Sequence, residues 1–251
     1  NFDWAIVREY IFNGSLIQGA EITLALTVLA QFSGIVLGIL CALGKQSRII
    51  PVRLVVELYI WLFRGTPVFV QLIMWYTGLP QIIPALQSLN EFQIALLALG
   101  LNEGAYMSEI VRAGLEAIDP GQTEAAQSVG MRYGRIMRRI VLPQAMRVII
   151  PPTGNELISM LKTTSLASYI SVQELTQRSE NIFGCTLCDG STRNLELLSI
   201  ASVYYLVMTT VISIGQAYIE SRLGDRRGRD EGGFFAFWGR VVNSMGTGIR
   251  R

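Results

Sequence analysis

The stretch Glu124-Ala125-Ala126-Gln127-Ser128-Val129-Gly130 decides how this chain is arranged. It opens a polar segment that continues to Arg139 and ends at Ile140-Val141-Leu142-Pro143. The segment carries one acid and four arginines, whereas the segments on both sides are apolar and long enough to cross a bilayer. A compact basic segment between two membrane helices indicates a cytoplasmic docking surface. The four arginines are Arg132, Arg135, Arg138 and Arg139.

This polar segment has an alternative interpretation, an amphipathic surface helix that binds anionic lipid through its arginines. Three of its residues, Ala125, Ala126 and Gly130, are small. Small side chains favour close contact with another protein over burial in lipid, so we favour docking to a soluble partner. Pro143 then fixes the direction in which the chain enters the next apolar segment.

The composition is that of an integral membrane protein. Of the 251 residues, 51% are hydrophobic and 16% are charged, against about 25% charged in a soluble domain. The chain has no histidine, which removes most zinc sites and every histidine-based triad, and we expect no metal site. Cys41 lies in an apolar run and is expected to pack there. Cys185 and Cys188 form Cys-x-x-Cys in a loop, as a local disulfide or as two free thiols.

We predict an all-α membrane fold with about five transmembrane helices, because a spanning helix needs roughly 20 mainly apolar residues. Gly34-x-x-x-Gly38 and the pair Gly100 and Gly104 have the spacing that lets two helices approach closely. The loop at 118–147 contains the docking segment, 1–224 form the membrane domain, and 225–251 form a basic, aromatic tail. The predicted spans are 20–43, 54–79, 92–117, 148–170 and 195–219.

Three local signals interrupt these segments. Pro67, in Arg64-Gly65-Thr66-Pro67, is expected to kink the second span. Pro151-Pro152 is expected to open the fourth span, and Thr123 is a candidate N-cap for the docking helix.

Basic residues in the loops predict the orientation. With five spans, the loops after the first and third share one side with the C-terminus, and 16 of the 21 lysines and arginines lie there. That side is therefore predicted to be cytoplasmic, and the N-terminus to be outside.

Ionisable and polar groups at membrane depth are candidates for function, because burying them in lipid is costly. Asn155, Ser159 and Lys162 fall at i, i+4 and i+7 and share one helix face, and Glu103 and Tyr106 share another. These five residues are our candidates for lining a substrate path. The alternative is that they only bond one helix to another.

Other charged residues in the spans receive a structural interpretation. Glu109 and Arg112 can pair at i, i+3, and Arg64 stands at the expected bend. We expect no catalytic residue, because the run from Gly38 to Gln46 fails as a phosphate loop and no hydrolase or dinucleotide motif is present.

The polar segment resembles a known motif. Glu124-Ala125-Ala126, Gly130, Ile140 and Leu142-Pro143 are similar in type and spacing to the EAA loop of bacterial ATP-binding-cassette (ABC) importer permeases. Further matches resemble the polar amino-acid branch, the histidine/glutamine/arginine-type permeases. These matches include Gly104-Ala105-Tyr106, Leu142-Pro143-Gln144-Ala145, Gly154-Asn155-Glu156, Lys162-Thr163-Thr164-Ser165-Leu166 and Glu174-Leu175.

The resemblance implies a type I importer permease in the bacterial inner membrane, a non-catalytic subunit that moves a polar amino acid into the cytoplasm. It implies a second permease subunit, two ABC ATPases that bind the ATP and Mg²⁺, and an extracytoplasmic amino-acid-binding protein, with no nucleic acid. The ATPase-docking residues would be Glu124, Ala125, Ala126, Gly130 and Arg135. An ion-coupled secondary transporter and a membrane anchor for a cytoplasmic partner are the alternatives.

Overall fold

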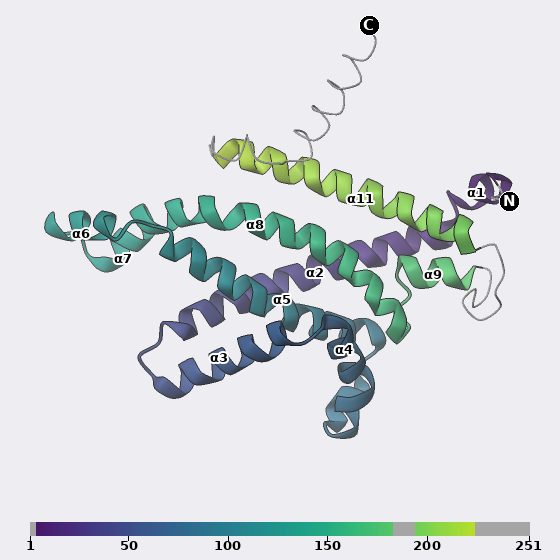
Figure 1. The fold of residues 1–251 in the computed structure, drawn as a ribbon, viewed down its shortest axis with the longest axis horizontal. Coiled ribbons are helices and arrows are strands. Elements are labelled where there is room, and N and C mark those ends of the chain that lie inside the picture. Colours follow the sequence, from purple (N-terminus) through teal and green to yellow (C-terminus); the bar gives the residue numbers. More distant parts are fainter. Residues whose placement is uncertain (1–3, 183–193, 224–251) are drawn as a thin grey trace, which may run out of the picture.

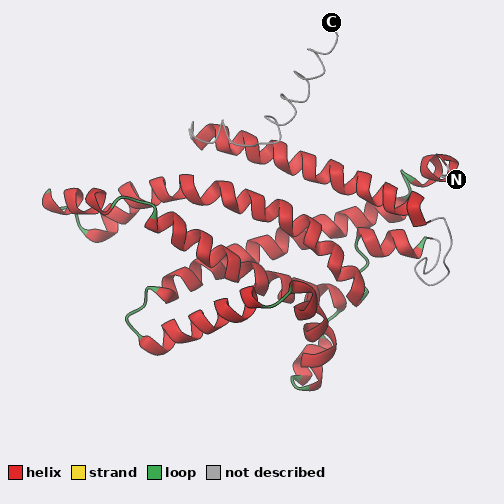
Figure 2. Ribbon diagram, in the orientation of Figure 1, coloured by secondary structure: helices red, strands yellow, loops and turns green. Residues whose placement is uncertain are grey.

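The computed structural model describes residues 4–182 and 194–223, and in these ranges every regular element is helical (Figure 2). The prediction of an all-α fold is confirmed. Cys185 and Cys188 and the tail at 225–251 lie outside the described residues.

Three described helices are long and apolar enough to cross a membrane: α2 (Gly14–Lys45), α5 (Glu91–Glu116), and the part of α11 (Asn194–Leu223) from Leu198 onward. A fourth span is counted if α3 (Ile50–Gly65) and the elements that follow it form one broken span. Helix α8 (Leu142–Thr163) occupies the fourth predicted span but is not among these helices. Its polar residues explain this, because they lower its hydropathy.

The second predicted span is broken rather than kinked, which corrects our expectation for Pro67. Helix α3 ends at Gly65 and α4 (Val68–Ile73) begins after Pro67. The direction of α3 differs by 107° from that of the segment Val68–Gln81. Thr66 and Pro67 both adopt extended backbone, with ψ angles of 145° and 134°. A residue that precedes proline is pushed out of the helical region, so the break takes two residues.

Side-chain amides hold this corner together. Nε2 of Gln71 donates to the carbonyl oxygen of Phe63 at 2.9 Å and to that of Thr66 at 3.1 Å. Asn102 of α5 donates to the same Phe63 oxygen at 3.1 Å and to Oε1 of Gln71 at 3.0 Å. Both amides are buried, so carbonyls freed by the break keep partners inside the bundle.

Pro151 and Pro152 lie inside α8 and do not open it, which corrects another expectation. The helix starts at Leu142, with Pro143 in its first turn, where a missing N–H costs nothing. Nε2 of Gln216 on α11 donates to the Pro151 carbonyl at 3.2 Å.

Helices α2 and α5 form the centre of the bundle, and their glycines set the contact. A Cβ added at Gly34 would overlap the side chain of Glu103, and one at Gly38 would lie 2.5 Å from Cβ of Met107. On the facing helix, a Cβ at Gly104 would lie 2.8 Å from Leu37. The two small-residue motifs of the sequence therefore meet in one interface.

Several connecting elements lie at opposite ends of the bundle, whereas α4 and the short elements after it project from its side (Figure 1). Near one end lie the α2–α3 turn, the docking loop and the C-terminal end of α11. Near the other lie α1 (Trp4–Tyr10) and α9 (Leu175–Asn181). The loops with the basic excess thus share one end, although which end faces the cytoplasm stays a prediction. Short elements complete the chain: η1 (Met74–Gly78), η2 (Leu79–Gln81), η3 (Pro84–Ser88) and η5 (Thr164–Ile170).

Candidate docking loop and membrane path

The docking motif forms a short helix, α6 (Pro120–Ser128). Its N-cap is Asp119, whose Oδ1 accepts a hydrogen bond from the backbone N–H of Gly121 at 2.8 Å. The expectation of Thr123 as N-cap is wrong, because Pro120 already occupies the first helical turn. Asp119-Pro120 is thus the start signal, a capping residue followed by proline at the first helical position.

Gly130 ends this helix in the left-handed conformation, with φ at +79°. Its N–H donates to the carbonyl of Gln127 at 2.9 Å, and the N–H of Met131 donates to that of Ala126 at 3.1 Å. This pair of bonds is a Schellman motif, in which glycine avoids the strain that a Cβ would bring. Gly130 therefore sets the direction of the chain leaving α6.

A small hydrophobic cluster fixes α6 to the bundle. Ala126 is 5% exposed and packs with Ile136 of α7 (Tyr133–Ile136) and Val141 of η4 (Met137–Val141). Leu115 at the end of α5 and Ile118 pack against the same cluster. A displacement of α6 would therefore be transmitted to α5.

The solvent side of the loop carries the predicted residues Glu124, Ala125 and Arg135, all exposed. Ala126, by contrast, faces the loop's own core. Sequence reasoning missed Val129 and Tyr133, which are 76% and 65% exposed beside the motif. Their signal was available: large apolar or aromatic side chains inside an otherwise polar segment.

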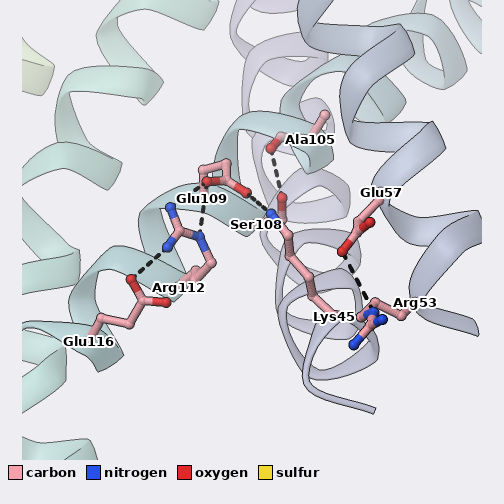
Figure 3. Close-up of polar contacts among 8 residues, drawn as sticks. All are labelled: Lys45, Arg53, Glu57, Ala105, Ser108, Glu109, Arg112 and Glu116. Carbon is pink, nitrogen blue, oxygen red and sulfur yellow. Dashed lines mark hydrogen bonds and ion pairs between the residues drawn. The ribbon is translucent and has the colours of Figure 1, made fainter. Parts of the chain in front are cut away.

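A chain of ion pairs joins α2 to the C-terminal part of α5 (Figure 3). Glu109 accepts from Nζ of Lys45 at 2.7 Å and from Nη2 of Arg112 at 2.8 Å, and Arg112 also pairs with Glu116 at 2.5 Å. The predicted Glu109–Arg112 pair is confirmed. The link to Lys45 of α2 was missed, since nothing in the local spacing reveals a partner 64 positions away.

Three members of this chain of ion pairs, Lys45, Arg112 and Glu116, border a groove of about 780 Å³ between the docking loop and the ends of α2, α3 and α5. Its lining mixes Lys45, Arg112 and Glu116 with Glu124 of α6 and the aromatic Tyr133.

The candidates for the substrate path do not come together within this chain. Glu103 is 3% exposed and lies against Gly34 in the α2–α5 interface, and Tyr106 stacks beneath the guanidinium of Arg64 at 5.4 Å. Two of the candidates on α8, Ser159 and Lys162, are exposed.

Asn155, the third candidate on α8, is also exposed. Its Oδ1 accepts a hydrogen bond from Gln216 of α11 at 3.1 Å. The three α8 residues therefore present one polar, solvent-accessible helix face.

A buried carboxylate lies near the opposite end of the molecule, outside the spans. Glu174 caps α9 by accepting from the N–H of Gln177 at 2.9 Å, and it also accepts from the hydroxyl of Tyr205 on α11 at 2.9 Å and, at 3.4 Å, from that of Thr23 on α2. Burial raises the pKa of Glu174, and these hydrogen bonds oppose the rise. Sequence reasoning had matched this residue to the family pattern without giving it a role.

The described residues thus form a bundle with apolar helices long enough to span a membrane, a projecting loop helix at one end and one exposed polar helix face, as a membrane permease would. Residues 34–225 match the family model of the binding-protein-dependent transport system inner membrane component. The chain belongs to this family. It is therefore a permease subunit of an ABC importer, and the alternative of a secondary transporter is not supported.

Individual relatives are similar over most of the chain. Identity is 44% to the arginine transport system permease protein ArgU of Corynebacterium glutamicum, over 87% of this chain and 71% of the relative. It is 34% to the glutamine transport system permease protein GlnP of Escherichia coli K12, over 88% and 98%. A crystal structure of an amino acid ABC transporter with histidines matches with a TM-score of 0.79 and 38% identity, over 88% and 99%.

Family membership settles the coarse features of the prediction. The chain is a multi-pass inner-membrane protein, and as a permease of this family it works with an ATPase and a binding protein. The number of partners, the orientation and the substrate belong to the proposal below.

Proposed function

We propose that this chain moves a polar amino acid into the cytoplasm and is driven by ATPase subunits that dock on α6. The observation that carries the proposal is the form of α6. It is a short helix whose outer side is exposed, whose inner residue Ala126 is locked into a hydrophobic cluster, and whose exit is fixed by Gly130. The names of the similar permeases, which include arginine, cystine and glutamine systems, support the substrate class.

On this proposal the complex contains two permease subunits, two ABC ATPases and an extracytoplasmic amino-acid-binding protein. The ATPases bind ATP and Mg²⁺, and this chain binds neither. The N-terminus lies outside and the C-terminus in the cytoplasm, as the basic residues of the loops predict. Each ATPase receives α6 through Glu124, Ala125, the Gly130 turn and Arg135, while Ala126 anchors the helix from within.

The packing of the loop provides a path by which a movement of α6 reaches the membrane helices. When the ATPases close and move α6, the cluster around Ile136 moves the end of α5 through Leu115. Helix α5 lies in glycine contact with α2 and therefore carries that helix with it. The ion pairs of Glu109 with Lys45 and Arg112 stiffen the same joint.

Replacing Gly130 by valine tests the docking proposal. A branched side chain at φ +79° strains the Schellman turn and re-aims the chain beyond α6. We expect uptake into vesicles to fall at least tenfold while ATP hydrolysis continues and the permease subunits remain assembled. Gly134→Ala is the matched control, because Gly134 has ordinary φ and open space at its Cβ position. Unchanged uptake in Gly130→Val would rule out the docking role.

The substrate path is proposed to follow the polar face of α8 formed by Asn155, Ser159 and Lys162. An amino and a carboxyl group can both be satisfied there, because the face offers a cation together with amide and hydroxyl groups. Glu103 and Tyr106 act from α5, at the contacts with α2 and Arg64.

Lys162→Met and Ser159→Ala should raise the KM for uptake without changing ATPase docking, measured by transport in proteoliposomes. A membrane anchor would show no such change.

A further inference from the structure

The loop at 118–147 contains a second surface beside α6, which shares Arg135 with the proposed docking surface. This surface contains a hollow of about 460 Å³. It is lined by Gly134 and Arg135 of α7 and by Arg138 and Arg139 of η4. All three arginines are exposed. The sequence presented one basic segment, whereas the structure divides it into a docking helix of small residues and a separate arginine hollow.

The arginines of this hollow are uncompensated. Within residues 4–182 and 194–223, the ion pairs involve Lys45, Arg53 and Arg112, and none involves Arg135, Arg138 or Arg139. Cations held around one small space repel each other, and an anion in that space relieves the repulsion. Guanidinium groups also present paired N–H donors that suit phosphate oxygens.

Apolar surface continues directly from the hollow. Leu142 follows Arg138 by about one helical turn and is 42% exposed, and Met146, four residues on, is 44% exposed. The next helix leads from there into the predicted membrane span. Exposed aliphatic side chains next to arginines match the boundary between acyl chains and headgroups, where cationic side chains reach to the polar layer.

We propose that this hollow binds the phosphate headgroup of an anionic phospholipid of the cytoplasmic leaflet, with Leu142 and Met146 against its acyl chains. The choice of leaflet rests on the orientation in the proposed function. A carboxylate of the ATPase is the competing partner, but it would not account for the apolar continuation. Because η4 shares the hydrophobic cluster that anchors α6, a lipid bound here would brace the base of the docking helix.

The test uses the permease assembled with its ATPase in nanodiscs of phosphatidylcholine, with or without phosphatidylglycerol. Native mass spectrometry counts the phosphatidylglycerol retained per permease. In the double variant Arg138→Gln/Arg139→Gln we expect the affinity for phosphatidylglycerol to fall about tenfold, since each basic residue near an anionic surface contributes several-fold. The control variant Arg48→Gln/Arg132→Gln removes the same charge outside the hollow and should change retention less than twofold.

Two further measurements complete the test of lipid binding. In pure phosphatidylcholine the double variant should keep its ATPase subunits, and inorganic phosphate should not displace the lipid. Unchanged retention of phosphatidylglycerol, loss of the ATPase in phosphatidylcholine, or displacement by phosphate alone would each overturn the proposal. Gly130→Val in the same nanodiscs should lose coupling yet retain the lipid, so a failure of docking is distinguishable from a failure of lipid binding.

Discussion

The α2–α5 interface and the docking loop both depend on glycine, but for different physical reasons. At Gly34 and Gly38, an added Cβ would overlap atoms of the facing helix, so glycine sets the distance between two helices. At Gly130 a Cβ would meet nothing within 4 Å, yet φ is +79°, so glycine sets a direction. Close contact between helices therefore defines the core, whereas backbone conformation defines the docking loop.

A substitution at Gly38 should disrupt the α2–α5 interface more than any other change proposed below. Its added Cβ would lie 2.5 Å from Cβ of Met107 and 2.9 Å from backbone atoms, which cannot rotate away. We expect Gly38→Val to destabilise the chain by about 3 kcal/mol or more and to abolish a monodisperse permease on size exclusion. Gly215→Val is the control, because Gly215 also lies inside a long helix but has open space at its Cβ position. Equal yields of the two variants would contradict contact as the function of Gly38.

The loop should respond to backbone preference rather than to size. Asparagine tolerates the left-handed region better than other non-glycine residues, whereas valine is among the worst. Gly130→Asn should therefore retain several times more coupled uptake than Gly130→Ala, and Gly130→Val the least. If uptake instead followed side-chain volume, with alanine above asparagine, contact with the partner would be the limiting factor.

The joint between the two regions contains Lys45, and its removal should have a moderate effect. Lys45→Met leaves Glu109 with Arg112 as its remaining ion-pair partner, at 2.8 Å, in a half-buried position. We expect a loss of about 1 kcal/mol, or roughly 3 °C in the melting temperature. Arg53→Gln is the control, because its pair with Glu57 is 3.8 Å long and exposed, and it should change the melting temperature by less than about 1 °C.

The smallest expected effect is a pH-dependent change in stability at Glu174, which lies outside both glycine regions. The pKa of Glu174 is raised in the folded chain, which means that folding favours the protonated carboxyl. This stabilisation is complete at a pH below the pKa of the unfolded chain, and it is lost as the pH rises through the pKa of the folded chain. Relative to Glu174→Gln, the wild type should lose melting temperature as pH rises from about 4. Circular dichroism at several pH values measures this, and a constant difference would contradict it.

Local and periodic signals in the sequence predicted part of the structure. The small-residue spacing of α2 and α5 and the Glu109–Arg112 pair follow from residues close in the chain, whereas the N-cap of α6 and the size of the bend at Pro67 did not. Lys45 could not be assigned to Glu109, because that contact depends on how α2 crosses α5.

The burial of individual side chains was the second feature that could not be predicted from the sequence. Glu103 remains a candidate for the substrate path, but its burial against Gly34 in the α2–α5 interface was not visible in the sequence. Periodicity identifies which residues share a helix face. It does not identify what that face meets.

The corner between α3 and α4 has a consequence for membrane insertion. Its Phe63 carbonyl is bonded by Gln71 from α4 and by Asn102 from α5, and Asn102 also orients Gln71. Asn102 lies 39 positions after Phe63 in the chain, so it is synthesised after the carbonyl to which it donates. The corner therefore cannot reach its final bonding until α5 packs against it, so the break in the second predicted span depends on the helix that follows it.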